Sequence, residues 1–315
     1  MLRTEKNITS ERPIKEISVA LVLLVRPNPN NLSLDSIASF LKIKSIKSSQ
    51  KYISIPNESF NKIENSIKDS KNIKLILQPK FIALGRSKLK FLNSKLKEDY
   101  VIIVHDDDIY SPQLICKPIE IIKKYSPIAL ALHATQVDQD LKIFKGRRSN
   151  NSKRTKKLSP IKVLARYFLP FEKALITPAI FLKRTELIRY WEENGITIGS
   201  HEDVKMHYIL SQRGDFLEWE NPNLYFYRMH KNQDSFQRNE FDRLRLIAWL
   251  KNLELNSIYK IIFLGSSKLQ YFIFYKKIKT RFSYLSYILK ELRMKLIRHR
   301  NGGKVFKKLK INDLN

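Results

Sequence analysis

The stretch 100–110, Tyr-Val-Ile-Ile-Val-His-Asp-Asp-Asp-Ile-Tyr, limits the possible folds more than any other part of the chain. Its apolar half shows no alternation of polar and apolar residues, which is typical of a strand buried on both faces of a parallel α/β sheet. Ligands of open α/β sheets bind just beyond the carboxyl ends of such strands. Because side chains alternate along extended backbone, we expect Asp106 and Asp108 to point to one side and Asp107 to the other.

Carboxylates that converge at a strand end suit a hard cation such as Mg²⁺ or Mn²⁺ that carries a phosphate. Asp106 and Asp108 are therefore candidate metal ligands. The alternative is an acidic loop that merely follows a strand, which is the commoner meaning of an isolated Asp-x-Asp. We also expect Asp108 to face solvent, so that its removal costs about 1 kcal/mol or less of stability.

Strand-like and helical stretches alternate along the chain. This pattern predicts βαβ units, and hence a Rossmann-like α/β fold with a mostly parallel sheet and flanking helices. The expected strands are residues 17–25, 52–55, 73–77, 100–104, 128–133, 179–182 and 224–227. The expected helices lie near residues 34–46, 60–70, 84–96, 113–124 and 200–213. Residues 146–157 contain no apolar side chain and are expected to form a mobile basic loop.

The chain of 315 residues carries a net charge of +29, which implies attraction to an anionic partner such as nucleic acid, a lipid surface or a phosphorylated substrate. Lys, Ile and Asn are all abundant, so we treat the charge as weak evidence for nucleic acid. The single cysteine, Cys116, excludes an intramolecular disulfide and fits a reducing compartment. The apolar run 17–25 is too short to span a bilayer, so we expect a cytoplasmic protein.

The helix expected at 200–213 begins with an acidic pair, Glu202-Asp203. Ser200 as N-cap with Asp203 three residues later resembles a capping box, and acidic side chains favour a helix N-terminus through the helix dipole. A structural role as helix cap is therefore open beside a catalytic role.

Arg228 and His230 lie two residues apart on an extended segment, which puts them on one face. Arginine offers a planar set of donors for phosphate oxygens, and histidine can bind a metal or a diphosphate. The alternative is an edge strand with ordinary polar residues.

The order and spacing of these motifs, over roughly residues 15–240, resemble the GT-A fold glycosyltransferases of the large inverting family two. The segment 179–187 also looks like that family's acceptor-side strand. The resemblance implies that the protein moves a sugar from a nucleotide-sugar donor to an acceptor hydroxyl with the help of Mn²⁺ or Mg²⁺. It implies the following roles: Asp106, Asp108 and His230 as metal ligands, Arg228 and His230 at the donor diphosphate, Asp107 as a further donor-binding residue, and Asp203 as the catalytic base with Glu202 beside it.

The chain departs from the family pattern at two donor-binding positions. An aspartate usually follows the second strand and contacts the nucleotide base; here Asn57 would have to take its place. The usual Arg-Asn pair before the Asp-x-Asp is represented at best by Arg86. The resemblance implies a UDP-linked donor, while these departures leave the nucleotide open.

The last part of the chain is basic, aromatic and helical in pattern. Apolar side chains recur at helical spacing, with basic residues on the other faces, at Phe282, Leu285, Leu289, Leu292 and Leu296. Such a helix can lie on an anionic membrane, and the alternative is packing against the rest of the protein. We therefore divide the chain into a loose segment 1–14, a GT-A domain 15–250 and a basic helical extension 251–315.

The expected partners are a nucleotide sugar, a glycan or lipid-linked acceptor and an anionic surface such as the inner face of the plasma membrane. Nucleic acid is not expected. Two other functional classes remain open from the sequence: a metal-dependent phosphohydrolase or nuclease that uses Asp106 and Asp108, and a non-catalytic basic nucleic-acid-binding protein.

Overall fold

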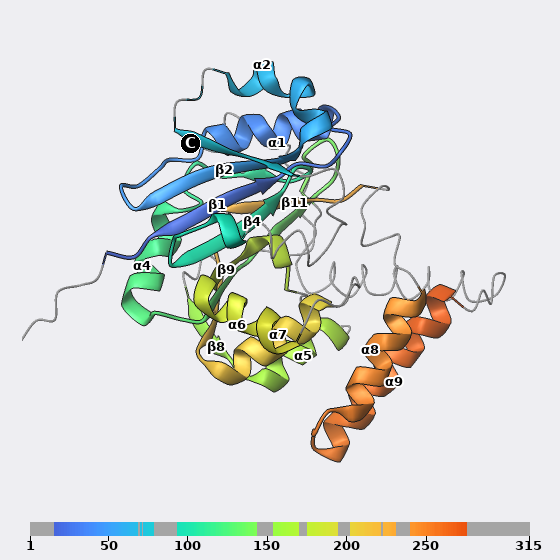
Figure 1. The fold of residues 1–315 in the computed structure, drawn as a ribbon. Helices are drawn as coiled ribbons and strands as arrows, with labels where there is room; N and C mark the ends of the chain where they lie inside the picture. The colour runs from blue at the N-terminus through green and yellow to red at the C-terminus, as the bar shows by residue number, and fades with distance from the viewer. Residues whose placement is uncertain are drawn as a thin grey trace, which may run out of the picture.

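The structure, a computed structural model, describes residues 16–68, 70, 72–78, 93–143, 154–169, 175–194, 202–221, 223–230 and 240–275. Arg86, the segment 1–14, most of the expected basic loop and the apolar repeat at 282–296 lie outside these residues. Figure 1 shows a central sheet with helices on both sides and a helical hairpin, α8–α9, that projects from one end.

The main sheet has eight strands in the order β3-β2-β1-β4-β9-β6-β10-β8. Neighbours pair in parallel from β3 to β4 and between β6 and β10, whereas β9 and β8 run antiparallel to their neighbours. This mixed α/β sheet confirms the expected fold class. In the same order, the strands are Ile73–Gln78, Ser49–Pro56, Val19–Leu24, Tyr100–His105, Ile180–Lys183, Ala129–Leu132, Phe216–Trp219 and Thr155–Leu158.

A second, three-stranded sheet has the order β5-β11-β7. It consists of β5 (Ile109–Tyr110), β11 (Tyr225–Arg228) and β7 (Thr135–Val137). The three consecutive aspartates form the turn between β4 of the main sheet and β5 of this sheet. The acidic turn therefore lies where the two sheets meet.

Helices cover both faces of the main sheet because its central strands are apolar on both sides. Val19, Leu21 and Leu23 of β1 pack in one cluster with residues of α1 and α4. Ala20 and Val22, which point the other way, pack in a second cluster with residues of α6 and α7. The helices are α1 (Asn31–Leu41), α2 (Glu64–Ile67), α4 (Cys116–Tyr125), α5 (Pro160–Phe168), α6 (Arg184–Asn194), α7 (Glu202–Arg213), α8 (Glu240–Asn252) and α9 (Ser257–Tyr275).

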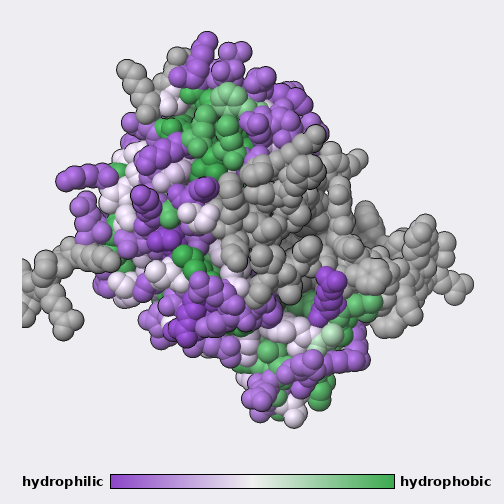
Figure 2. Space-filling model, in the orientation of Figure 1, coloured by the Kyte–Doolittle hydropathy of each residue, from purple (hydrophilic) through white to green (hydrophobic). Residues whose placement is uncertain are grey.

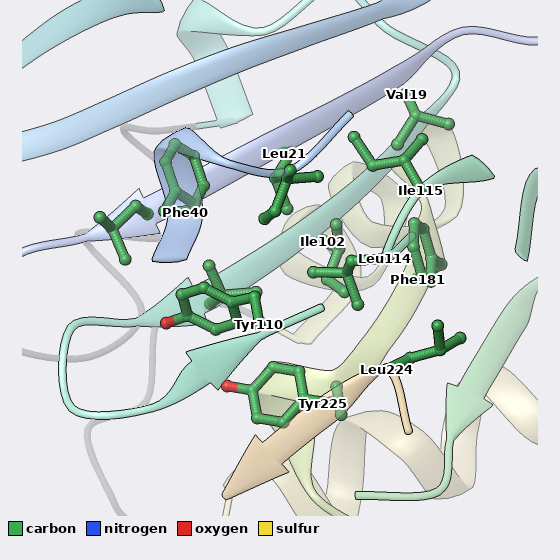
Figure 3. Packing of buried hydrophobic residues seen from close by; sticks show 14 of the residues in the cluster. Val19, Leu21, Phe40, Ile102, Tyr110, Leu114, Ile115, Phe181, Leu224 and Tyr225 are labelled. Atoms are coloured by element: carbon green, nitrogen blue, oxygen red, sulfur yellow. The ribbon is translucent and has the colours of Figure 1, made fainter. Parts of the chain in front are cut away.

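The first cluster extends to the smaller sheet through two tyrosines (Figure 3). The rings of Tyr110 and Tyr225 meet edge to face, with centroids 5.5 Å apart, and Phe40 of α1 makes a similar contact with Tyr110. Edge-to-face pairs of this kind add to the stabilisation from burial. These aromatic contacts connect α1 to β5 and β5 to β11, next to the acidic turn.

The helical hairpin packs on the domain through one apolar cluster. Leu246 and Leu250 of α8 and Phe263 of α9 are buried against side chains of α5 and α7. The helical part thus begins at Glu240, within the range that we assigned to the GT-A domain. Among the described residues, no helix combines the length and apolar character needed to cross a bilayer.

One local expectation was wrong. Residues 155–157 do not belong to a loop but to β8, which pairs antiparallel with β10 at the edge of the sheet. Leu158 is buried, and the lysines next to it form ion pairs, Lys156 with Glu220 and Lys157 with Asp215. An edge strand accepts exposed lysines because only one of its sides is paired, and a composition rule for loops misses such a strand.

Candidate functional site

The carboxyl ends of β1 and β4 form the centre of the candidate site. These strands pair in parallel, with Leu24 opposite His105, so the residues that follow them also lie side by side. As a consequence Arg26, which follows β1, comes next to Asp106 and Asp107, which follow β4. In open α/β sheets this edge is where ligands bind.

The carboxylate of Asp106 is held by hydrogen bonds from two residues, Arg26 and Ser33. This carboxylate accepts hydrogen bonds from the backbone N–H of Arg26 at 3.1 Å, from Nε of Arg26 at 3.0 Å and from the hydroxyl of Ser33 at 2.7 Å. Ser33 lies in the first turn of α1, where it also forms a capping box with Asn30. The start of α1 thus fixes the position of the Asp106 carboxylate.

Asp107 lies between an arginine and a histidine. Nη2 of Arg26 is 3.0 Å and Nε2 of His230 is 2.8 Å from the same carboxylate oxygen. Burial raises the pKa of Asp107, but the positive potential of His105, the His230 hydrogen bond and Arg26 together outweigh it, so that the pKa lies below its ordinary value. Asp107 is therefore ionised at neutral pH.

Asp108 is fully buried, and its carboxylate serves the junction of the two sheets. It accepts a 2.5 Å hydrogen bond from the hydroxyl of Tyr225 and a 2.9 Å hydrogen bond from the backbone N–H of Arg228. Burial and the charge of Asp107 raise the pKa of Asp108 well above its ordinary value. Our expectation that Asp108 faces solvent was wrong.

The expected alternation of the three aspartates was also wrong, because β4 ends at His105 and the chain then turns. A turn breaks the two-residue period on which the expectation depended. As a result Asp106 and Asp107 share Arg26, while Asp108 hydrogen-bonds to residues of β11.

The described side chains do not offer a ready metal site. Within the part of the chain that the structure describes, no three His, Cys, Asp or Glu side chains are arranged to share one ion. Asp106 and Asp107 already have a cationic partner in Arg26, and His230 hydrogen-bonds to Asp107. The metal roles of Asp106, Asp108 and His230 thus remain predictions that this arrangement of side chains does not match.

Arg228 and His230 are both buried behind the acidic turn. The guanidinium of Arg228 lies 3.4 Å from the half-exposed carboxylate of Asp35 in α1, while His230 lies on Asp107. The two side chains thus lie at the expected edge of the sheet, and their role at a diphosphate remains a prediction.

Asn57 is exposed at the start of a 3₁₀ turn, Asn57–Lys62, that follows β2. This turn contacts the loop after β1, because the hydroxyl of Ser59 donates to the backbone carbonyl of Pro27. Asn57 is thus at the same edge of the sheet as Arg26, and its role at a nucleotide base remains a prediction.

Asp203 and Glu202 form the first turn of α7, and each accepts a hydrogen bond from a neighbouring element. The hydroxyl of Thr177 donates to Asp203 at 2.9 Å, and the hydroxyl of Tyr190 donates to Glu202. Thr177 opens the 3₁₀ turn Thr177–Ala179 that precedes β9. Because β9 runs antiparallel to β4, this turn lies at the same end of the sheet as the acidic turn.

Sequence reasoning missed five residues that donate hydrogen bonds to these carboxylates: Arg26, Ser33, Thr177, Tyr190 and Tyr225. The nearest signal was the position of Arg26, which follows an apolar strand just as the aspartates do. This position predicts a contact with the aspartates only if β1 and β4 are neighbours in the sheet, and the order of strands along the chain does not determine that.

No family model and no curated protein matches the sequence. Solved structures do match. S. aureus TarS, residues 1–349, is 13% identical with a TM-score of 0.55, over 84% of this chain and 75% of that chain. Its complex with UDP-GlcNAc gives 11% identity and a TM-score of 0.56, over 84% and 74% of the two chains. The mannosyltransferase PcManGT from Pyrobaculum calidifontis, in complex with GDP-Man and Mn²⁺, gives 8% identity and a TM-score of 0.53, over 92% and 78%.

At this level of identity the likeness establishes the fold. The chain has the mixed α/β fold of the GT-A glycosyltransferases, as the resemblance of its motifs implied. The likeness covers between 84% and 92% of this chain in these comparisons.

Proposed function

We propose that this protein is a glycosyltransferase that moves a sugar from a nucleotide-sugar donor to an acceptor hydroxyl with inversion. The observation that carries the proposal is the position of Asp203. This partly buried carboxylate begins α7, is oriented by Thr177 and lies at the end of the sheet that also holds Asp106 and Asp107.

In this reaction Asp203 takes the proton of the acceptor hydroxyl as the oxygen attacks the sugar. A hydroxyl is a poor nucleophile, so a positioned base contributes roughly 10²- to 10⁴-fold in rate. The N-terminus of α7 favours the ionised form of Asp203, which a base requires. The departing nucleoside diphosphate carries negative charge and needs positive charge rather than a proton donor.

Several features support a sugar nucleotide as donor. The edge of β1, β2 and β4 offers cationic and hydrogen-bonding groups from Arg26 and His230, with Asn57 nearby for a base. Similar structures contain UDP-GlcNAc and GDP-Man. We propose a UDP-linked donor first and a GDP-linked donor as the comparison. The described carboxylates fit the Mn²⁺ or Mg²⁺ ion of the sequence prediction poorly, because Arg26 already pairs with Asp106 and Asp107.

The helical hairpin supports an acceptor at a membrane surface. Ile258 and Ile261 lie one helical turn apart on α9 and are 66% and 71% exposed. Figure 2 shows hydrophobic surface in this region, at the lower right. Because the whole chain has a net charge of +29, an anionic lipid surface would attract it. We therefore propose a glycan or lipid-linked acceptor, reached at the inner face of the plasma membrane.

A direct experiment is a thermal-shift screen of the full-length protein with UDP, GDP, ADP and their sugar conjugates, each in the presence of EDTA or Mn²⁺. We expect at least one nucleoside diphosphate to raise the melting temperature. Asp203→Asn should keep this shift but transfer or hydrolyse the sugar at least about a hundredfold more slowly. Salt-sensitive retention on DNA without any response to nucleotides would instead identify a nucleic-acid-binding protein.

A further inference from the structure

The cation of the acidic turn is a residue of the chain itself. The guanidinium of Arg26 bridges two neighbouring carboxylates: Nε lies 3.0 and 3.1 Å from the two oxygens of Asp106, and Nη2 lies 3.0 Å from Asp107. A planar guanidinium that holds two acidic groups in this way is a more specific arrangement than a surface ion pair.

Four features show that the arrangement is built into the fold. The register of β1 and β4 brings the backbone N–H of Arg26 onto Asp106. Ser33 and His230 donate to the same two carboxylates from α1 and from the segment after β11. The side chains of Asp106 and Asp107 are only 4% and 12% exposed. Two buried carboxylates without a cationic partner would cost folding free energy. Burial lowers the pKa of Arg26, but the negative charges of Asp106 and Asp107 together outweigh this effect, so that the pKa is raised.

A divalent ion would therefore have to displace Arg26 before it could reach Asp106 and Asp107. Asp108 offers little compensation, because its carboxylate already accepts hydrogen bonds from Tyr225 and from the backbone N–H of Arg228, at a fully buried position. Mg²⁺ and Mn²⁺ prefer several unhindered oxygen ligands.

We propose that Arg26 takes the place of the divalent ion in this site. Its Nε and Nη2 groups are held by the two carboxylates, which leaves the outer edge of the guanidinium directed away from them. At 27% exposure the side chain is accessible from solvent, and guanidinium N–H groups match phosphate oxygens. Arg26 thus offsets part of the negative charge of Asp106 and Asp107 and donates to the diphosphate of the donor. This last role rests on the proposed function, whereas the exclusion of metal does not.

The first experiment measures Mn²⁺ binding to the full-length protein without any nucleotide, from the loss of the electron paramagnetic resonance signal of free Mn²⁺. We expect no tight site in the wild type. Arg26→Gln removes the cation and leaves two carboxylates and His230 in place, so it should bind Mn²⁺ at least about tenfold more tightly. Mn²⁺ should also raise the melting temperature of Arg26→Gln and not that of the wild type.

Two further variants serve as controls for Arg26→Gln. Arg26→Lys keeps the positive charge and should stay without a Mn²⁺ site, even if its single ammonium holds the carboxylates less well. Arg189→Gln removes an exposed arginine that pairs with Glu193 on α6 and should behave as the wild type. A stoichiometric Mn²⁺ site in the wild type, or a folded Arg26→Gln variant that gains no Mn²⁺ affinity, would overturn the proposal.

The second experiment measures UDP and GDP binding by calorimetry in EDTA and in Mn²⁺. For the nucleotide that binds, we expect the same affinity under both conditions in the wild type, and an affinity that depends on Mn²⁺ in Arg26→Gln. Nucleotide binding to the wild type that vanishes in EDTA contradicts our proposal for Arg26. An absence of binding under every condition refutes the proposed function instead, while the Mn²⁺ measurement still decides what occupies the acidic turn.

Discussion

The hydroxyl of Tyr225 donates a hydrogen bond of 2.5 Å to the carboxylate of Asp108, which precedes it by 117 residues in the chain. Both side chains are fully buried, and the bond joins β11 to the turn that follows β4. The last of three consecutive aspartates therefore stabilises the junction of two sheets, and the first two face Arg26.

From this relationship we predict that Asp108→Ala strongly destabilises the protein. The change leaves the Tyr225 hydroxyl and the Arg228 backbone N–H buried without an acceptor, at about 1–3 kcal/mol for each. Tyr225→Phe should cost about 1–2 kcal/mol. The measurement is urea unfolding, with Asp140→Ala as control, since Asp140 is exposed and its pair with Lys142 should contribute little. Equal, small losses for Asp108→Ala and Asp140→Ala would contradict the buried role.

A second prediction concerns Thr177, which we expect to position Asp203. Thr177→Val keeps the shape but removes the 2.9 Å hydrogen bond to the carboxylate, so turnover should fall about tenfold while donor affinity is kept. Loss of a hydrogen bond to the charged form should also raise the pKa seen on the acidic limb of the rate profile. Thr177→Ser should restore both. An unchanged pH profile in Thr177→Val would leave Thr177 with a purely structural role.

A third prediction follows from His207, which is fully buried on α7 with Nδ1 2.5 Å from the hydroxyl of Tyr167. Burial lowers its pKa from 6.5 to about 3. Between these values the unfolded chain binds a proton at this position and the native protein does not, so the free energy of unfolding decreases as the pH falls. One proton corresponds to a slope of about 1.4 kcal/mol per pH unit.

Denaturant unfolding between about pH 6.5 and pH 4 tests this slope. Gln at position 207 cannot titrate, so the free energy of unfolding of His207→Gln should depend less steeply on pH than that of the wild type. The difference in slope should be up to about 1.4 kcal/mol per pH unit. The variant should be less stable than the wild type near neutral pH, where the buried ring packs against Phe216 and Tyr167. Identical slopes for the two proteins would show that His207 also takes up its proton in the native state.

The fourth prediction concerns membrane contact through α9. Replacing Ile258 and Ile261 by serine removes exposed apolar side chains, each of which would contribute roughly 1 kcal/mol on burial in the lipid interface. Sedimentation with anionic vesicles should then weaken about thirtyfold, and salt should release the wild type. Leu75 and Leu77 on the edge strand β3 are also exposed apolar residues, at 42% and 47%, and their replacement by serine is the control. Equal losses in both double variants would refute a specific role of α9.

The sequence by itself determined the fold class, because uninterrupted apolar runs such as 100–104 must be covered on both faces. It also predicted which residues form the candidate site. The three aspartates after β4, the acidic pair that opens α7 and the Arg-x-His segment at the end of β11 all lie at or close to the same end of the sheet. The local sequence pattern is sufficient for this, because the spacing of apolar residues predicts whether a segment is a helix or a strand. The residues at the ends of that helix or strand are then placed with it.

Only the tertiary structure decided which partner each carboxylate has. Arg26 meets Asp106 and Asp107 because β1 and β4 are neighbours in register, and Asp108 turns inward because β5 pairs with β11. Strand order and register depend on contacts between residues that are distant in the chain, such as Arg26 and Asp106, which are 80 positions apart. No local period encodes such contacts, so an acidic motif that reads as a metal site can fold around an arginine instead.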